Sequence, residues 1–235
     1  MAETFKRRAP SQWGEGGALK EEILAAAARL LAESGREEAL SLRAVAREVG
    51  IAAPSVYLHF KDRSELVATV TRRAYEKLVA ELGEARDGGT PTAPLAPHAS
   101  LTSHAPHTSL TSHSPHTPRT PHTPRSALRA MVHRYCTFAL ENPRRFRLMF
   151  GVERIVGPRE DSPRHPVWLV LGAWEEALAA LPADRPGQVG AEQDALLLWS
   201  ALHGIVTIAM ALPYEVDRRG LIQRADELLD RIVAG

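Results

Sequence analysis

Apolar side chains recur at intervals of three and four residues along most of this chain, which is the spacing of one buried helical face. The pattern predicts helices over residues 19–34, 42–49, 65–86, 126–141, 167–181, 191–212 and 221–233, with a shorter helix around 146–150. Gly or Pro follows most of these stretches, at positions where helices commonly end. The sequence therefore predicts an all-α fold.

Two short helices joined by a tight turn are predicted between Ser41 and Phe60. The hydroxyl of Ser41 can cap the first helix by accepting from backbone N–H groups of its opening turn. Gly50 stands where that helix should stop, because glycine adopts the left-handed conformation without a steric penalty. Pro54 is tolerated only in the first turn of a helix, so the second helix should begin near Ala52.

The second of these helices should bury one side and expose the other. Val56 and Phe60 are four residues apart and face its partner helix, which leaves a polar and aromatic outer face. A short helix of this kind is what a helix-turn-helix places in the major groove of DNA. We expect Tyr57 and Lys61 to contact phosphates and the start of the helix to face bases. The predicted DNA-binding residues are Ser41, Arg43, Ala53, Pro54, Ser55, Tyr57, His59 and Lys61.

The spacing in this region resembles a known family. The pattern Ser41-Leu-Arg-x-Val-Ala-x-x-x-Gly-Ile-x-x-x-x-Val-Tyr-x-His-Phe-x-x-x-x-Glu-Leu66 is similar to the N-terminal signature of TetR-family transcriptional regulators, over roughly residues 19–82. Ala52 departs from it, since such proteins often carry a Ser cap there. The resemblance implies a three-helix DNA-binding domain, a connecting fourth helix and a five-helix sensor domain. It also implies a homodimer that binds a palindromic operator, most often as a repressor.

A second resemblance lies in the most apolar helix. Trp199-x-x-x-His203-Gly204 is similar to the Trp-His-Gly element of one TetR subgroup. In that arrangement Trp199 and His203 lie one helical turn apart, and Gly204 would let another backbone approach closely. Packing or dimer contact is one interpretation of this element, and direct contact with a ligand is the other.

These patterns divide the chain into five parts. Residues 1–17 form a polar arm containing Lys6-Arg7-Arg8, which is either a frayed tail or an additional contact to DNA. The DNA-binding domain follows, and then come a connecting helix, a linker, and a sensor and dimerisation domain. The four parts after the arm cover residues 18–64, 65–86, 87–125 and 126–235.

The linker has a composition unlike the rest of the chain. It holds eight of the 17 prolines and six of the 10 histidines, and a nine-residue segment starting at Ser100 is repeated from Ser109. So few apolar side chains cannot offset the entropy lost on ordering, which predicts disorder. His-x-x-His pairs at His104/His107 and His113/His116 suggest weak metal affinity. Prolines within the pairs prevent the helix that would place both histidines of a pair on one face. We expect no physiological metal site.

Composition narrows the class of protein without deciding it. The net charge is only +1, so contact with DNA phosphates must come from a local group of cations. Cys136 is the sole cysteine, which excludes an internal disulfide and agrees with a reducing cytoplasm. No apolar leader is present at the N-terminus, and no uninterrupted apolar stretch approaches the length of a membrane span. We expect a cytoplasmic protein that does not contact the membrane.

The second half of the chain concentrates bulky side chains. An apolar cavity with a few polar groups is typical of a ligand site, whereas aromatic and Met side chains are also enriched in dimer interfaces. We expect the last two helices to form the dimer and the aromatic residues before them to line a pocket for a small apolar ligand. The predicted ligand-binding residues are Met131, Tyr135, Phe138, Met149, Phe150, Trp168, Trp174, Trp199 and His203.

No arrangement of nucleophiles, acids or bases typical of an enzyme is present, and no phosphate-binding glycine loop occurs. We therefore expect neither catalysis nor a cofactor. The alternative to a ligand-responsive regulator is an architectural DNA-binding protein without an effector. The aromatic residues of the second half argue against that alternative.

Overall fold

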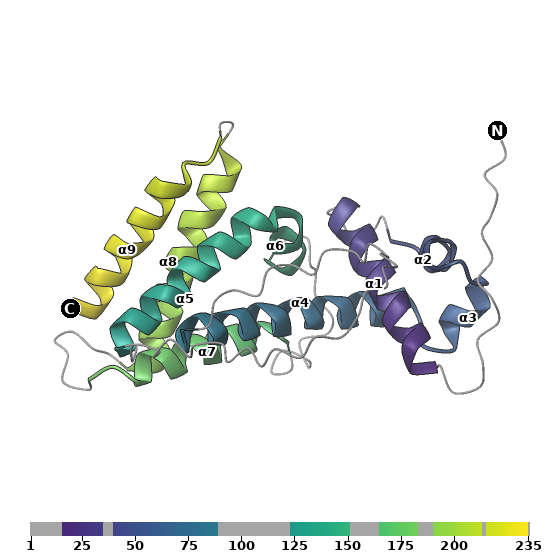
Figure 1. The fold of residues 1–235 in the computed structure, drawn as a ribbon, viewed down its shortest axis with the longest axis horizontal. Coiled ribbons are helices and arrows are strands. Elements are labelled where there is room, and N and C mark those ends of the chain that lie inside the picture. Colours follow the sequence, from purple (N-terminus) through teal and green to yellow (C-terminus); the bar gives the residue numbers. More distant parts are fainter. Residues whose placement is uncertain are drawn as a thin grey trace, which may run out of the picture.

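All regular structure in the described part of the chain is helical, which confirms the all-α prediction. The structure is a computed structural model and describes residues 16–34, 40–88, 123–150, 165–182, 190–212 and 215–234. Figure 1 shows an elongated arrangement in which one long helix joins two groups of helices. The helices are α1 (Gly16–Ser34), α2 (Leu42–Val49), α3 (Ala53–Tyr57), α4 (Arg63–Arg86), α5 (Pro124–Glu141), α6 (Pro143–Phe150), α7 (Val167–Ala179), α8 (Ala191–Ala211) and α9 (Arg218–Ala234).

The first hydrophobic core lies among α1, α2, α3 and the beginning of α4. Ile23 and Leu31 of α1 pack there with Val45 of α2 and Val56 of α3, all fully buried. Helix α4 contributes three further side chains, so the core extends beyond the boundary expected at residue 64. Those side chains are Leu66, Val67 and Val70. The first half of the connecting helix is therefore a structural part of the DNA-binding unit.

The second core is built by α5 to α9 around the remainder of α4. Its fully buried members include Leu78 of α4, Leu128 of α5, Leu198 of α8 and Leu229 of α9. Figure 1 places α8 and α9 side by side at the end of the molecule opposite α1 to α3. The predicted order of helices in the second half is confirmed by this arrangement.

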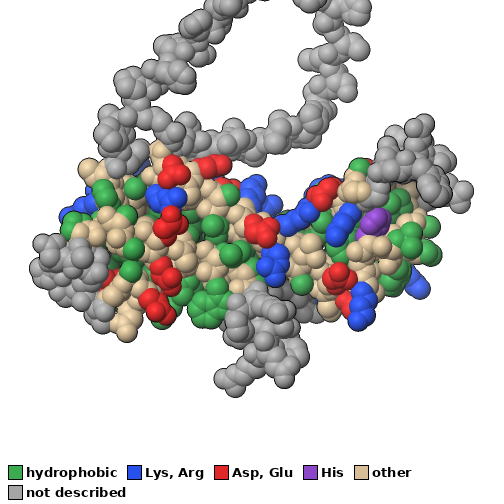
Figure 2. Space-filling model, turned by 90° about the horizontal axis from the view of Figure 1, so that it is seen from below, with side chains coloured by type: hydrophobic (Ala, Val, Ile, Leu, Met, Phe, Trp, Pro, Cys, Tyr) green, Lys and Arg blue, Asp and Glu red, His purple; other side chains and the backbone are tan. Residues whose placement is uncertain are grey.

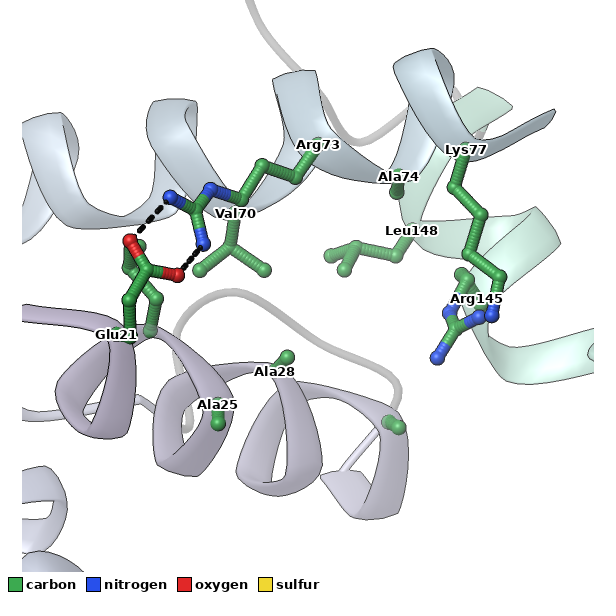
Figure 3. A pocket seen from close by; sticks show the side chains of 11 residues that line it. Glu21, Ala25, Ala28, Val70, Arg73, Ala74, Lys77, Arg145 and Leu148 are labelled. Atoms are coloured by element: carbon green, nitrogen blue, oxygen red, sulfur yellow. Dashed lines mark hydrogen bonds and ion pairs between the residues drawn. The ribbon is translucent and has the colours of Figure 1, made fainter. Parts of the chain in front are cut away.

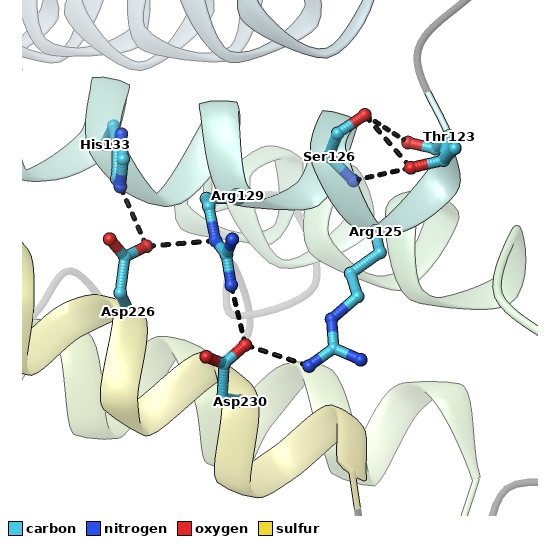
Figure 4. Close-up of polar contacts among 7 residues, drawn as sticks. All are labelled: Thr123, Arg125, Ser126, Arg129, His133, Asp226 and Asp230. Atoms are coloured by element: carbon cyan, nitrogen blue, oxygen red, sulfur yellow. Dashed lines mark hydrogen bonds and ion pairs between the residues drawn. The ribbon is translucent and has the colours of Figure 1, made fainter.

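Helix α9 is fastened to α5 by a row of charged side chains (Figure 4). The carboxylate of Asp226 lies 2.8 Å from His133 Nε2 and 3.2 Å from Arg129 Nε. Asp230 in turn accepts from Arg129 at 2.7 Å and from Arg125 at 2.9 Å. These pairs sit at the surface, where a single ion pair contributes little, but together they fix how α9 lies along α5.

Five helices, α1, α4, α5, α6 and α9, begin earlier than the sequence pattern indicated, and two of them begin at a proline. Helix α5 starts at Pro124, inside the predicted linker, because the Thr123 hydroxyl accepts from the Ser126 N–H at 3.2 Å and caps the helix. Helix α6 starts at Pro143, although a helix was expected only around 146–150. Proline is well suited to the first turn of a helix because its missing N–H has no intrahelical acceptor there. Most of the predicted linker, at 89–122, lies outside the described residues.

Helix α8 is long and apolar enough to span a membrane by length and composition alone. One third of its most apolar window is buried inside the structure, where it packs against α7 and α9. Leu198, Leu202 and Val206 supply that buried side. The helix therefore serves as a core element of the second domain, while Leu197 and Ile208 are exposed.

Candidate DNA interface and effector site

Helix α2 has the ends that the sequence predicted. The Ser41 hydroxyl accepts a hydrogen bond from the Ala44 N–H at 3.1 Å and so caps the helix. Gly50 adopts φ 79°, a left-handed conformation that favours glycine, and ends the helix. This turn sends the chain directly into the next helix and sets the angle between the two.

Helix α3 is short and held by two buried side chains. Its N-cap is Ala52, which has no side-chain hydrogen bond, and Pro54 occupies the first turn. Val56 is fully buried and Phe60 is 1% exposed, as predicted. Because the helix is anchored on this one side, its opposite side stays available at the surface.

The eight predicted DNA-binding residues lie on α2, α3 and the segments directly next to them. Ser41, Arg43, Pro54, Tyr57 and Lys61 are exposed, whereas Ala53, Ser55 and His59 are partly buried. Sequence reasoning missed Leu58, which is 83% exposed beside Tyr57 at 57%. A large apolar side chain this exposed at the end of the second helix could have been noticed from its position between Tyr57 and His59.

The start of α4 fixes the backbone at Lys61. The Asp62 carboxylate accepts from the Glu65 N–H at 2.9 Å, and Glu65 reaches back to accept from the Lys61 N–H at 2.6 Å. This reciprocal pair acts as a capping box, with Asp as the cap. The side chain of Lys61 is consequently presented from a fixed backbone position.

On the face of the molecule drawn in Figure 2, acidic and basic side chains are intermixed. Several cations near α1 and α2 are also paired, since Arg29 donates to Glu48 at 3.1 Å and Arg73 to Glu21 at 2.8 Å. Contact with phosphate would thus depend on particular exposed cations such as Arg43 and Lys61.

A second group of polar atoms lies in the core of the sensor domain. The Tyr135 hydroxyl accepts a hydrogen bond from Trp199 Nε1 at 3.0 Å and lies 2.9 Å from His203 Nδ1. With the His203 ring neutral and its proton on Nε2, the Tyr135 hydroxyl donates to Nδ1 while it accepts from the indole; with a proton on Nδ1, the ring donates to the phenol oxygen instead.

Aromatic rings surround this hydrogen-bonded group. The Phe146 ring stacks on His203 with centroids 5.1 Å apart, and the Phe150 ring meets His203 edge-on at the same separation. Phe150 also contacts Trp199 at 6.0 Å and Tyr75 at 5.3 Å. The structure thus brings together five predicted ligand residues: Tyr135, Phe150, Trp174, Trp199 and His203.

Sequence reasoning missed two members of this cluster, Phe146 and Tyr75. Tyr75 is 1% exposed, and its hydroxyl donates to the backbone carbonyl of Met149. Its position three residues before Leu78 and seven before Leu82 places it on the buried face of α4. That spacing could have identified it.

The other predicted ligand residues occupy different surroundings. Met131, Phe138 and Met149 are buried among the core side chains. Trp168 is 50% exposed on α7 and lies at the surface. Trp174 is fully buried, and its indole N–H has no acceptor among the described residues.

Burial changes the proton affinity of three groups here. Removal from water lowers the pKa of His203, which favours the neutral ring. The same effect raises the pKa of Tyr135, so its hydroxyl keeps its proton. Burial also raises the pKa of Cys136 to about 12, and a thiol protonated at neutral pH is a poor nucleophile.

An exposed helix-turn-helix joined to a helical domain with an aromatic, hydrogen-bonded interior defines the class of ligand-responsive DNA-binding regulators. Residues 23–70 match the family of bacterial regulatory proteins named tetR, and residues 128–235 match the tetracyclin repressor-like C-terminal domain. The chain therefore belongs to the TetR family of transcriptional regulators, which confirms the resemblance seen in the sequence. The narrower Trp-His-Gly subgroup stays a prediction.

A relative from Haemophilus influenzae, described as an uncharacterized HTH-type transcriptional regulator, is 36% identical over 64 residues. That match covers 27% of this chain and spans about a third (34%) of the relative.

Two solved structures share the fold over nearly the whole chain. SmeT, the repressor of the multidrug efflux pump SmeDEF of Stenotrophomonas maltophilia, has a TM-score of 0.60 at 21% identity, covering 94% of this chain and 91% of SmeT. FadR from Bacillus subtilis, solved in complex with stearoyl-CoA, has a TM-score of 0.60 at 11% identity, covering 92% of this chain and 98% of FadR. At these identities the likeness supports the fold alone.

Proposed function

We propose that this protein is a transcriptional repressor released from a palindromic operator by a small, largely apolar molecule. Two copies would bind duplex DNA, each through the exposed side of α3 and the segments next to it. SmeT is a repressor by its description, and FadR is described with a bound acyl-CoA, so both properties occur on this fold. The proposal rests chiefly on how the two domains of this chain are connected.

Helix α6 connects the two domains, because its side chains pack in both cores. Leu148 packs in the core of the DNA-binding unit, whereas Phe146 and Met149 pack in the sensor core. Phe146 also stacks on His203 inside the aromatic cluster. A ligand that displaces Phe146 must therefore disturb the helix that holds α1, and this gives the ligand a direct physical route to the DNA-binding unit.

The cluster suggests the chemistry of the effector. It is built of aromatic rings, and its polar atoms include the Tyr135 hydroxyl, the His203 imidazole and the Trp174 indole N–H, which has no acceptor among the described residues. A buried donor without an acceptor costs free energy, and a ligand carbonyl or ether oxygen could remove that cost. An apolar, aromatic molecule with one or two acceptor atoms fits this description best.

Helix α8 supports dimerisation through the last two helices. Leu197 and Ile208 are 59% and 64% exposed and lie eleven residues apart, about three helical turns, so they share a face. Gly204 lies on the same face, and no described atom of this chain comes within 4 Å of the position a Cβ would take there. The close approach expected at Gly204 is thus not made within one chain, and α8 of a second copy would supply it.

A regulator of this kind acts in the cytoplasm and performs no catalysis. The Tyr135 hydroxyl is hydrogen-bonded to the side chains of Trp199 and His203, and Cys136 is buried with a raised thiol pKa. An architectural DNA-binding protein would need no such hydrogen-bonded group in its second domain. The ligand-responsive function is therefore preferred.

Selection of duplexes from a random library by the full chain tests the first half of the proposal. We expect an enriched palindrome bound by two protomers. Hydrophobic aromatic compounds should then be titrated into the complex while tryptophan fluorescence and DNA release are followed. Release at the concentrations that change the fluorescence supports the proposal. A protein that enriches no symmetric sequence contradicts it.

A further inference from the structure

A cleft separate from the aromatic cluster lies where the DNA-binding unit meets the sensor (Figure 3). It has a volume of about 220 Å³ and is lined by three helices that are distant in sequence, α1, α4 and α6. None of the nine predicted ligand residues lines it. Its apolar walls are formed by Leu24, Ala25 and Ala28 of α1, Val70 and Ala74 of α4, and Leu148 of α6.

The two ends of the cleft differ in charge. At one end Arg73 of α4 and Glu21 of α1 form an ion pair with two hydrogen bonds, so that end is electrically neutral. Lys77 of α4 and Arg145 of α6 lie at the other end in Figure 3. That end carries two positive charges from two different helices.

These two cations lack a strong carboxylate partner. The nearest acid to Lys77 is Glu81, at 3.9 Å, and Glu81 is itself held by a closer pair with Arg134 at 2.5 Å. No ion pair of Arg145 occurs among the described residues, although Arg145 is partly buried. Two like charges at one end of an apolar cleft create a local preference for an anion.

We propose that this cleft binds a small amphipathic carboxylate as a second ligand of the protein. The acid group would sit between Lys77 and Arg145, and a ring or short chain would lie against Val70 and Leu148. A dry cavity of about 150 Å³ is known to accept benzene, so this cleft has room for a ring together with its carboxylate. A planar guanidinium can bind both oxygens of such a group at once.

Occupation of the cleft would act on DNA binding as well. Its walls belong to α1 on one side and to α4 and α6 on the other, so a ligand that touches α1 and α6 restrains their relative motion. A ligand that prefers one arrangement of these helices must change the affinity for operator, and operator must change the ligand's affinity by the same factor. This site goes beyond the proposed effector site and does not depend on it.

Binding of benzoate to the full chain without DNA, followed by NMR of the ligand, tests the proposal. We expect saturable binding, with benzyl alcohol binding much more weakly because it has no charge. Arg145→Gln should weaken benzoate about tenfold, the usual size of a lost charge-assisted hydrogen bond. Arg144→Gln is the matched control, since Arg144 is exposed on the same helix and does not line the cleft.

A second variant fills the cleft instead of changing its charge. Ala28→Leu projects a larger side chain from α1 into the apolar region and should abolish benzoate binding, while helicity by circular dichroism stays as in the natural protein. No saturable benzoate binding in the natural protein overturns the proposal. Equal affinity for benzyl alcohol overturns it as well, and so does an unchanged affinity in either Arg145→Gln or Ala28→Leu. Because DNA is absent, these results are independent of whether the protein is a repressor.

Discussion

Leu148 and Met149 are neighbours in sequence, yet their side chains are buried in two different cores. Leu148 packs with the DNA-binding helices, and Met149 packs with the sensor helices. One short helix, α6, therefore ties the two domains together beside the longer connection made by α4. Any change in the sensor core that moves α6 will alter the packing of α6 against α1.

Shortening the Leu148 side chain tests whether α6 stabilises the contact between the two domains. Leu148 is 6% exposed, and removing a buried Leu side chain typically costs about 2–5 kcal/mol. We expect Leu148→Ala to lose about that much stability against urea, whereas Leu148→Met should lose less than about 1.5 kcal/mol. Leu58→Ala, at an exposed position, is the control and should change stability by less than about 0.5 kcal/mol. Equal stability of the Leu148→Ala and Leu58→Ala proteins would contradict this role for α6.

The hydrogen bonds around Tyr135 give the second prediction. Tyr135→Phe keeps the ring but removes the hydroxyl that accepts from Trp199 Nε1 and is hydrogen-bonded to His203 Nδ1. The indole N–H is then left without its acceptor in the core, at a cost of about 1–3 kcal/mol. Urea unfolding should show that loss, while Tyr57→Phe on the exposed helix should unfold as the natural protein does. A Tyr135→Phe protein of unchanged stability would mean that the Trp199 indole N–H finds another acceptor.

The pKa of His203 leads to a prediction about pH. Burial lowers it below its ordinary value of 6.5, so the unfolded chain binds a proton at a higher pH than the folded protein does. The stabilisation is fully present above pH 6.5 and is lost as the pH falls below that value toward the lower folded pKa. His203→Gln should remove this part of the pH dependence of stability, which lies below about pH 6.5. Identical pH profiles of unfolding for the two proteins would argue against a buried neutral His203.

The outward face of α8 gives a prediction about assembly. Leu197→Glu should place a charge in the proposed dimer contact and yield a monomer in sedimentation. Its operator affinity should also fall, because two half-sites are no longer bound together. Ala80→Glu, which adds the same charge at an exposed position of α4, should remain dimeric. A dimer that survives Leu197→Glu would place the contact elsewhere.

The sequence predicted the helix-turn-helix well because its signals are local. Ser41, Gly50 and Pro54 each specify a cap or a turn through their own chemistry, and the structure has them in those positions. The start of α6 was placed late because Arg144 and Arg145 follow Pro143 without an apolar period. In the structure the proline alone is sufficient to begin the helix there.

The sequence predicted only part of the aromatic interior of the sensor domain. Spacing shows that Tyr135, Trp199 and His203 face inward, but it does not show that α5 and α8 pack so that Trp199 and His203 both reach the Tyr135 hydroxyl. Trp168 was grouped with them because it is aromatic, and the structure places it half exposed. The cleft beside Arg145 could not be predicted, because its walls come from helices more than a hundred residues apart.

The salt dependence of operator binding tests the central claim most directly. Lys61 is exposed at a backbone position fixed by the Glu65 carboxylate, so its side chain should contact one phosphate. We expect Lys61→Ala to weaken binding about equally across sequences and to lower the slope of log affinity against log salt by about one. Arg218→Ala, at an exposed cation on α9 at the far end of the molecule, should leave both unchanged. An unchanged footprint and an unchanged slope in Lys61→Ala would contradict the assignment of this helix-turn-helix as the DNA-binding surface.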